Sequence, residues 1–70
     1  MTRSLLTLRP CYEGWKLLDN GEDVFWFPEQ SAALAVANTM AEARHAFSQV
    51  ATAVELEQDG QPPERLSSYG

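Results

Sequence analysis

Several short stretches of this chain have patterns of apolar and polar residues that are typical of β-strands. Residues 4–9 are one such stretch, and we expect Pro10 to end the first strand. Residues 15–18 and 24–27 are two further runs of aliphatic and aromatic residues that suit a pleated surface. The Asp-Asn-Gly-Glu sequence at 19–22 joins them, and its Asn-Gly pair tolerates the positive φ of a tight hairpin turn. The first part of the chain therefore predicts three strands, the last two forming a hairpin.

A longer segment, from Glu29 to about Val50, is rich in alanine and contains no glycine or proline, which favours a helix. Pro28 precedes it and suits the first turn of a helix, where the missing N–H is tolerated. Its apolar residues recur three and four apart, as Ala33, Val36, Met40, Ala43, Phe47 and Val50. The opposite positions are polar: Asn38, Glu42, His45 and Gln49. We expect one amphipathic helix whose small stripe residues allow it to lie close to a sheet.

The remainder of the chain returns to strand patterns. Residues 53–57 alternate cleanly, and Gln58-Asp59-Gly60 follows as a turn. Pro62-Pro63 cannot donate backbone hydrogen bonds and so marks a loop or a sheet edge, while residues 66–69 can add a short last strand. We expect one α+β domain, residues 1–70, in which an antiparallel sheet of three to five strands (β-β-β-α-β-β) carries one helix on one face.

Large apolar side chains are expected on both faces of this sheet. Alternation puts Phe25 and Phe27 on one face and Val24 and Trp26 on the other. Because one helix covers only one face, the second needs another cover, and a clustered exposed apolar patch usually marks an interface. The alternative is that Trp26 lies over the stem of Lys16 or an arginine and tolerates water. The candidate contact residues are Trp26, Val24, Leu18, Leu5 and Tyr69, and the expected partner is a second copy or another protein.

Composition narrows the choice of partner. The 70 residues carry ten acidic side chains against five Lys and Arg, a net charge of −5. An acidic body repels phosphates, which argues against non-specific nucleic-acid binding and against an anionic membrane surface. No apolar run is long enough to span a membrane, and residues 1–10 do not resemble a signal peptide, so we expect neither a membrane span nor export. The lone Cys11 excludes an internal disulfide and fits a reducing cytoplasm, and Cys11 and His45 are too few soft ligands for a structural zinc ion. We therefore expect self-association to be the means by which so small a chain gains stability.

Two groups of residues invite a chemical interpretation without completing a site. Cys11 could be a nucleophile with His45 as its base, but we place the thiol in a loop and the histidine on the polar helix face. A cluster of carboxylates surrounds the Asn-Gly turn: Asp19, Glu22 and Asp23. Their spacing is not that of a calcium loop, and solvated turn residues explain them better.

A pair of carboxylates, Glu55 and Glu57, points the same way from one strand and is better explained by pairing with Arg9 or Lys16 than by acid–base catalysis. Aromatic residues on an open sheet can also stack the bases of a single-stranded nucleic acid, but that role needs basic surroundings. We therefore expect no enzyme activity and no metal or other cofactor.

Six short motifs occur along this chain in an order that is similar to that in a family of very small bacterial domains of unknown function. They are the Gly14-Trp15 hairpin, Gly21, the alanine-rich helix, Val54-Glu55-Leu56, the Asp59-Gly60 turn and the closing Ser68-Tyr69-Gly70. The resemblance implies strands, one helix and further strands, and it implies no activity. A more distant likeness is to antitoxin-like domains with a strand-strand-strand-helix-strand core, although the DNA-binding segment that such proteins append has no counterpart here.

Overall fold

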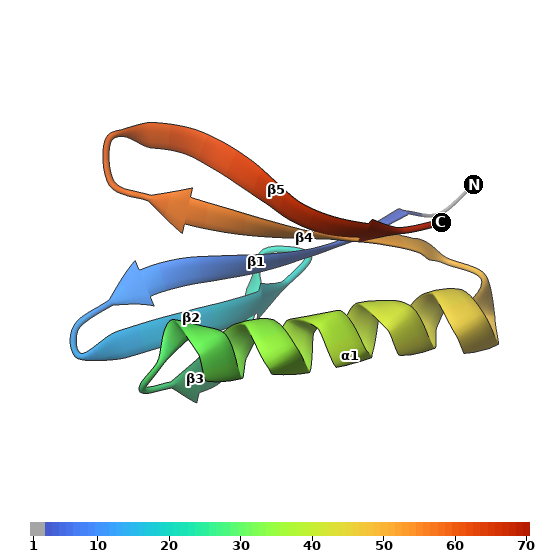
Figure 1. Ribbon diagram of the computed structural model, residues 1–70, viewed down its shortest axis with the longest axis horizontal. Helices are drawn as coiled ribbons and strands as arrows, with labels where there is room; N and C mark the ends of the chain where they lie inside the picture. Colours follow the sequence, from blue (N-terminus) through green and yellow to red (C-terminus); the bar gives the residue numbers. More distant parts are fainter. Residues whose placement is uncertain (1–2) are drawn as a thin grey trace.

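Residues 3–70, which the computed structural model describes, form one five-stranded sheet with one helix packed on one of its faces (Figure 1). In chain order the elements are β1 (Arg3–Cys11), β2 (Gly14–Asp19), β3 (Glu22–Phe27), α1 (Gln30–Ser48), β4 (Ala51–Gln58) and β5 (Gln61–Tyr69). Across the sheet the strands lie in the order β3-β2-β1-β4-β5. The predicted α+β class, the order β-β-β-α-β-β and the helix on one face are confirmed.

The sheet is mixed, so the expectation of a purely antiparallel sheet is wrong at one pairing. β1 and β4 are parallel, with Leu6 opposite Val54 and Leu8 opposite Leu56, whereas the other three pairings are antiparallel. The reason lies in the path of the chain. β3 ends at the same end of the sheet as β1, and α1 carries the chain back along the sheet (Figure 1). β4 therefore starts beside the start of β1 and runs in the same direction.

The turn between β2 and β3 is the hairpin that the sequence predicts. Asn20 has φ of 52° and Gly21 has φ of 90°, so both central residues take the left-handed conformation of a primed turn. Asn20 also ties this turn to β1: its N–H donates to the carbonyl of Leu5 at 2.8 Å, and its Oδ1 accepts the Leu5 N–H at 2.7 Å.

Prolines occupy two strands without ending them. We expected Pro10 to end β1, but the strand continues to Cys11. β1 pairs with β4 only as far as Leu8, so Pro10 has a neighbouring strand on one side only and its missing N–H is tolerated. Pro62 and Pro63 lie in β5, which is an edge strand and starts earlier than the expected residue 66.

The core lies between α1 and one face of the sheet. Three alanines of the helix, Ala33, Ala37 and Ala41, are fully buried against leucine and valine side chains of β1, β2 and β4: Leu6, Leu8, Leu17, Val54 and Leu56. The predicted apolar stripe, which includes Phe47, is not the side of the helix that faces the sheet, because Phe47 is 88% exposed. The contact follows the four-residue spacing of the alanines, whose small side chains let the helix approach the sheet, while Val36 and Met40 fill the flanks.

A half-buried ion pair joins the carboxyl-terminal part of α1 to the sheet. Arg44 donates its Nη1 to Asp19 Oδ1 at 2.7 Å and its Nη2 to Asp19 Oδ2. The same Nη1 donates to the hydroxyl of Ser4 at 2.8 Å. Because these hydrogen bonds favour the charged forms, the pKa of Asp19 is lowered and the pKa of Arg44 is raised. The pair holds α1, β1 and β2 together at one end of the sheet.

Candidate interaction surface

The sheet has a second face turned away from α1, which we call the reverse face. Three ion pairs link neighbouring strands on it: Arg9 Nε to Glu57 Oε1 at 2.8 Å, Lys16 Nζ to Asp23 Oδ2 at 3.1 Å, and Arg65 Nη2 to Glu55 Oε2 at 3.1 Å. The cross-strand pairing expected for Glu55 and Glu57 is confirmed, with Arg9 among the partners. The hydrogen bond between Glu57 and Arg9 lowers the pKa of the carboxyl and raises that of the guanidinium. Much of this face is therefore charged rather than apolar.

The apolar side chains at the centre of the reverse face are buried or half-buried. Leu18 belongs to this face, because it lies opposite Thr7 in the register and next to the core residue Leu17. Both Leu18 and Thr7 are buried, and Leu18 is only 4% exposed, while Leu5 is half-buried. Leu18 and Leu5 therefore do not form the broad apolar patch that we expected on this side.

The candidate contact residue Tyr69 lies on the other face. It is opposite Thr52 in the register, and it packs against the core cluster beneath α1. Its neighbour Ser67 points the same way and donates a hydrogen bond to Asn38 Oδ1 of the helix at 2.6 Å. Tyr69 is thus separated from Trp26 by the sheet itself.

The exposed apolar residues gather instead along β3, which is an edge of the sheet. Val24, Phe25 and Trp26 are consecutive and are 37%, 48% and 52% exposed. The ring of Trp26 lies beside Gly14, where a Cβ would come within 2.7 Å of it, on the reverse face. Phe25 lies on the helix side, with its ring centroid 6.2 Å from that of Phe27. We call Val24, Phe25 and Trp26, with the free backbone edge of β3, the β3 edge surface.

The sequence pattern predicts Trp26 and Val24 as contact residues but does not predict Phe25. The alternation placed Phe25 on the same face as Phe27, which packs against the core. Phe25 is nevertheless half exposed because β3 is the outermost strand. Strand order decides which side chains lie at an edge, and the local pattern does not contain it. The run of four apolar residues at 24–27, longer than alternation requires, was the available signal.

The opposite edge of the sheet, β5, is protected against pairing with a further strand. β5 has a free side along its whole length, but Pro62 and Pro63 have no N–H to offer a further strand. Its next two residues, Glu64 and Arg65, are charged and exposed. Within residues 3–70, β3 is therefore the edge better suited to pairing with another strand.

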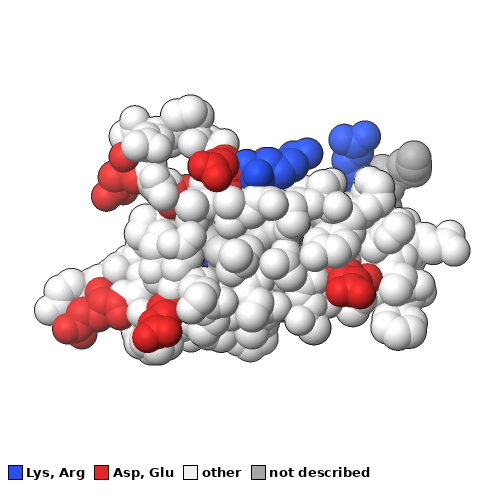
Figure 2. Space-filling model, viewed as in Figure 1, with Lys and Arg blue, Asp and Glu red and all other residues white. Residues whose placement is uncertain are grey.

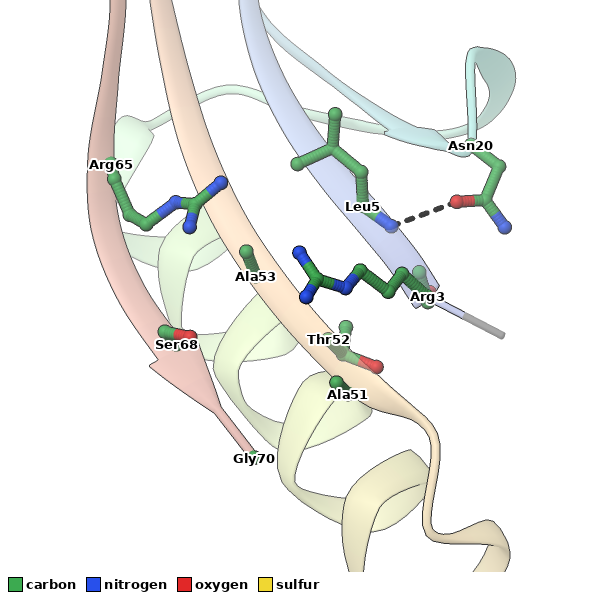
Figure 3. Close-up of a pocket in the computed structure, with 10 residues that line it drawn as sticks. Arg3, Leu5, Asn20, Ala51, Thr52, Ala53, Arg65, Ser68 and Gly70 are labelled. Atoms are coloured by element: carbon green, nitrogen blue, oxygen red, sulfur yellow. Dashed lines mark hydrogen bonds between the residues drawn. The ribbon is translucent and has the colours of Figure 1, made fainter. Parts of the chain in front are cut away.

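A hollow lies at one end of the reverse face, over the start of β1 and β4 and the end of β5 (Figure 3). Its volume is about 350 Å³. Small residues form its floor and rim, namely Ala51, Ala53, Ser68 and Gly70, and the side chains of Arg3 and Arg65 flank it. This hollow was not anticipated from the sequence, because it depends on strands that are adjacent only in the folded sheet.

The residues considered for catalysis or metal binding are dispersed. Cys11 ends β1, whereas His45 lies beside Gly70 and Ala51 at the opposite end of that strand. Eight residues of extended chain separate those ends by roughly 25 Å. Around the hairpin turn, Asp19 binds Arg44 and Asp23 binds Lys16. Over the described range 3–70, no three His, Cys, Asp or Glu residues come together in an arrangement that could hold a metal ion.

Comparisons with known proteins returned no match to any family model, curated protein or solved structure. The resemblance to small bacterial domains therefore stays a prediction. The helix of the described region is not apolar enough over its length to cross a membrane.

Proposed function

We propose that this chain is a non-catalytic homo-oligomerisation module of the cytoplasm, in which two copies pair through their β3 edge surfaces. The observation that carries the proposal is the combination of an unpaired strand edge with three consecutive exposed apolar residues, Val24, Phe25 and Trp26. An exposed apolar edge strand is a ready template for another strand. Adding a strand there supplies backbone hydrogen bonds and covers apolar surface at the same time.

Charge supports an antiparallel arrangement of the two strands. β3 begins with Glu22 and Asp23 and ends with Trp26 and Phe27. In an antiparallel pair, the acidic start of one strand lies beside the aromatic end of the other, so the carboxylates of the two copies stay apart. A parallel pair would place them side by side, which is unfavourable.

The contact is centred on the regular part of β3. A β-bulge interrupts the pairing with β2 near Val24, whereas Phe25, Trp26 and Phe27 remain in register with that strand. A stable interface covers about 800 Å² on each partner, which is roughly a sixth of the 4652 Å² surface of this chain. One strand alone covers less than that. The second copy must therefore also cover Phe25 on the helix side and Trp26 on the reverse side.

A second copy of this chain fits the β3 edge surface better than a nucleic acid does. Bases could stack on Trp26, but the basic side chains beside it in the sheet are already engaged with carboxylates. Lys16, opposite Trp26 in the register, binds Asp23, and Arg9, opposite Lys16, binds Glu57. Neutralised arginines and lysines contribute little of the phosphate attraction on which nucleic-acid binding depends. The antitoxin-like alternative depends on the order of elements alone, and no described residue favours it further.

Sedimentation equilibrium over a range of micromolar concentrations tests the proposal. We expect a reversible dimer, and we expect Trp26→Ser to weaken it about thirtyfold, the typical loss for a buried aromatic at the centre of an interface. Phe47→Ser is the matched control, because Phe47 is an aromatic residue that is more exposed than Trp26 and lies in the last turn of α1, outside the β3 edge surface. A wild-type chain that remains a 7.8 kDa monomer, or a dimer that both substitutions weaken equally, would contradict the proposal.

A further inference from the structure

The hollow on the reverse face is built by small residues between two arginines. Ala51 and Ala53 of β4 and Ser68 of β5 have short side chains, so the sheet surface is low there. Arg3 rises from β1 on one side and Arg65 from β5 on the other. Figure 3 shows the two guanidinium groups turned toward each other across β4. The two positive charges therefore lie above a part of the sheet that carries only small side chains.

The charge of this hollow is opposite to that of the chain as a whole. The chain has ten acidic residues and five basic ones, yet among the described residues that line the hollow two are arginines and none is acidic. In Figure 2 the basic side chains gather along the upper border, above β4 and β5, whereas carboxylates occur on several sides. The hollow is thus a local region of positive charge on a molecule that is acidic as a whole.

The two arginines differ in how far they are already engaged. Within residues 3–70, Arg3 makes no ion pair. Arg65 donates only Nη2 to Glu55, at 3.1 Å, and 60% of its side chain is exposed. A guanidinium carries five N–H donors, so most of the donors on both side chains are free. The hydroxyl of Ser68 is a further donor on the rim.

We propose that this hollow binds the phosphate group of a small molecule, with Arg3 and Arg65 as its two principal donors. A carboxylate has two oxygens, and one guanidinium fork satisfies both. A phosphate monoester presents three charged oxygens and can accept hydrogen bonds from two guanidinium groups at once. The volume of about 350 Å³ is at the lower end of the range for small-molecule sites. The ligand is therefore a small phosphorylated compound.

Nuclear magnetic resonance titration with inorganic phosphate, at constant ionic strength and pH 7.5, tests the site directly. We expect saturable shifts of the backbone amides of Leu5, Ala53 and Ser68. Arg3→Gln should weaken binding about tenfold, as expected for the loss of one charged donor group. Arg9→Gln is the matched control: it removes the same charge from the same strand and face, but Arg9 does not line the hollow. Equal weakening by the two substitutions would overturn the proposal, as would shifts that never saturate.

A second pair of variants predicts a gain in affinity. Glu55→Gln releases Arg65 from its ion pair, so phosphate should bind several-fold more tightly. Glu57→Gln removes the same negative charge from the same strand but releases Arg9 instead, and it should have little effect. If both substitutions strengthened phosphate binding equally, the gain would come from the change in net charge and not from the release of Arg65. That result would overturn the proposed site.

The chemical class of the ligand is tested by comparing related compounds. Phosphoserine should shift the same amides as inorganic phosphate, and serine should not. Acetate that binds as tightly as phosphate would contradict the assignment to a phosphate group. Because the hollow lies over β1, β4 and β5, Trp26→Ser on β3 should leave the phosphate titration unchanged. Failure of the phosphate site and failure of the proposed dimer can thus be told apart.

Discussion

Replacing Asp19 with asparagine is expected to destabilise the fold by about 2 kcal/mol, because the carboxylate binds the guanidinium of Arg44 through two hydrogen bonds. The asparagine amide keeps one acceptor oxygen, so one of the two charged hydrogen bonds is lost. The pair is less than a third exposed, with 29% of the Arg44 side chain and 23% of the Asp19 side chain accessible. Water therefore screens it only in part. The effect should fall below the ~3–5 kcal/mol that accompanies the loss of one partner from a fully buried pair.

Urea unfolding at pH 7, followed by circular dichroism, measures this difference. In a domain of this size a loss of about 2 kcal/mol lowers the melting temperature by roughly 10 °C. Glu57→Gln is the control, because it breaks the more exposed pair with Arg9 in which about half of the arginine side chain is accessible. Exposed ion pairs contribute little to stability. If the two substitutions destabilised the protein equally, burial of the Asp19–Arg44 pair would not be the cause of its effect.

The pH dependence gives an independent check. Arg44 lowers the pKa of Asp19 in the folded state below its unfolded value of about 3.9. The unfolded chain therefore takes up the proton first, and the stabilisation is complete above the unfolded pKa. It is lost as the pH falls through the folded-state pKa. The difference in unfolding free energy between the wild type and Asp19→Asn should be constant near neutrality and should shrink in acid. A difference that persisted through the acid range would refute the assigned pKa shift.

Three further substitutions test other parts of the structure. Gly14→Ala places a Cβ 2.5 Å from the backbone oxygen of Phe27 and 2.7 Å from the Trp26 ring, so we expect a loss of about 1–3 kcal/mol and a changed tryptophan fluorescence spectrum. Ala37→Leu inserts bulk where the helix is fully buried and should destabilise the protein by a similar ~1–3 kcal/mol in urea unfolding. Replacing both prolines at 62–63 with threonine should unblock the β5 edge, and light scattering should then detect larger assemblies.

Some of the fold follows directly from local chemistry. The Asn20-Gly21 pair specifies the hairpin because the backbone there takes positive φ at both residues. The alanine-rich segment specifies the helix, which begins at Gln30, only one residue from the predicted start. The alternation at 53–57 likewise identifies β4, which extends a few residues further at its start. In each case the residues that determine the structure are neighbours along the chain.

Other features depend on residues far apart in sequence. Nothing in the local pattern of β1 distinguishes a parallel neighbour from an antiparallel one, so the pairing with β4 was not predicted. The exposure of Phe47 has the same origin. Its position on the helix fits an apolar stripe, but the alanines at 33, 37 and 41 decide which side of α1 meets the sheet. The hollow between Arg3 and Arg65 could not be predicted from the sequence either, because those residues come near each other only when β5 pairs with β4.

The parallel pairing of β1 with β4 has a consequence for how the chain acquires its structure. Each paired residue of β1 meets a residue 48 positions later, as Leu6 meets Val54. During synthesis the first three strands leave the ribosome well before this partner exists, and Leu6 and Leu8 then lack both the helix and β4 as cover. Contacts between such distant positions form slowly, because a long loop must close first. Truncation before β4 should therefore leave a nascent chain that is prone to aggregate rather than a smaller folded unit.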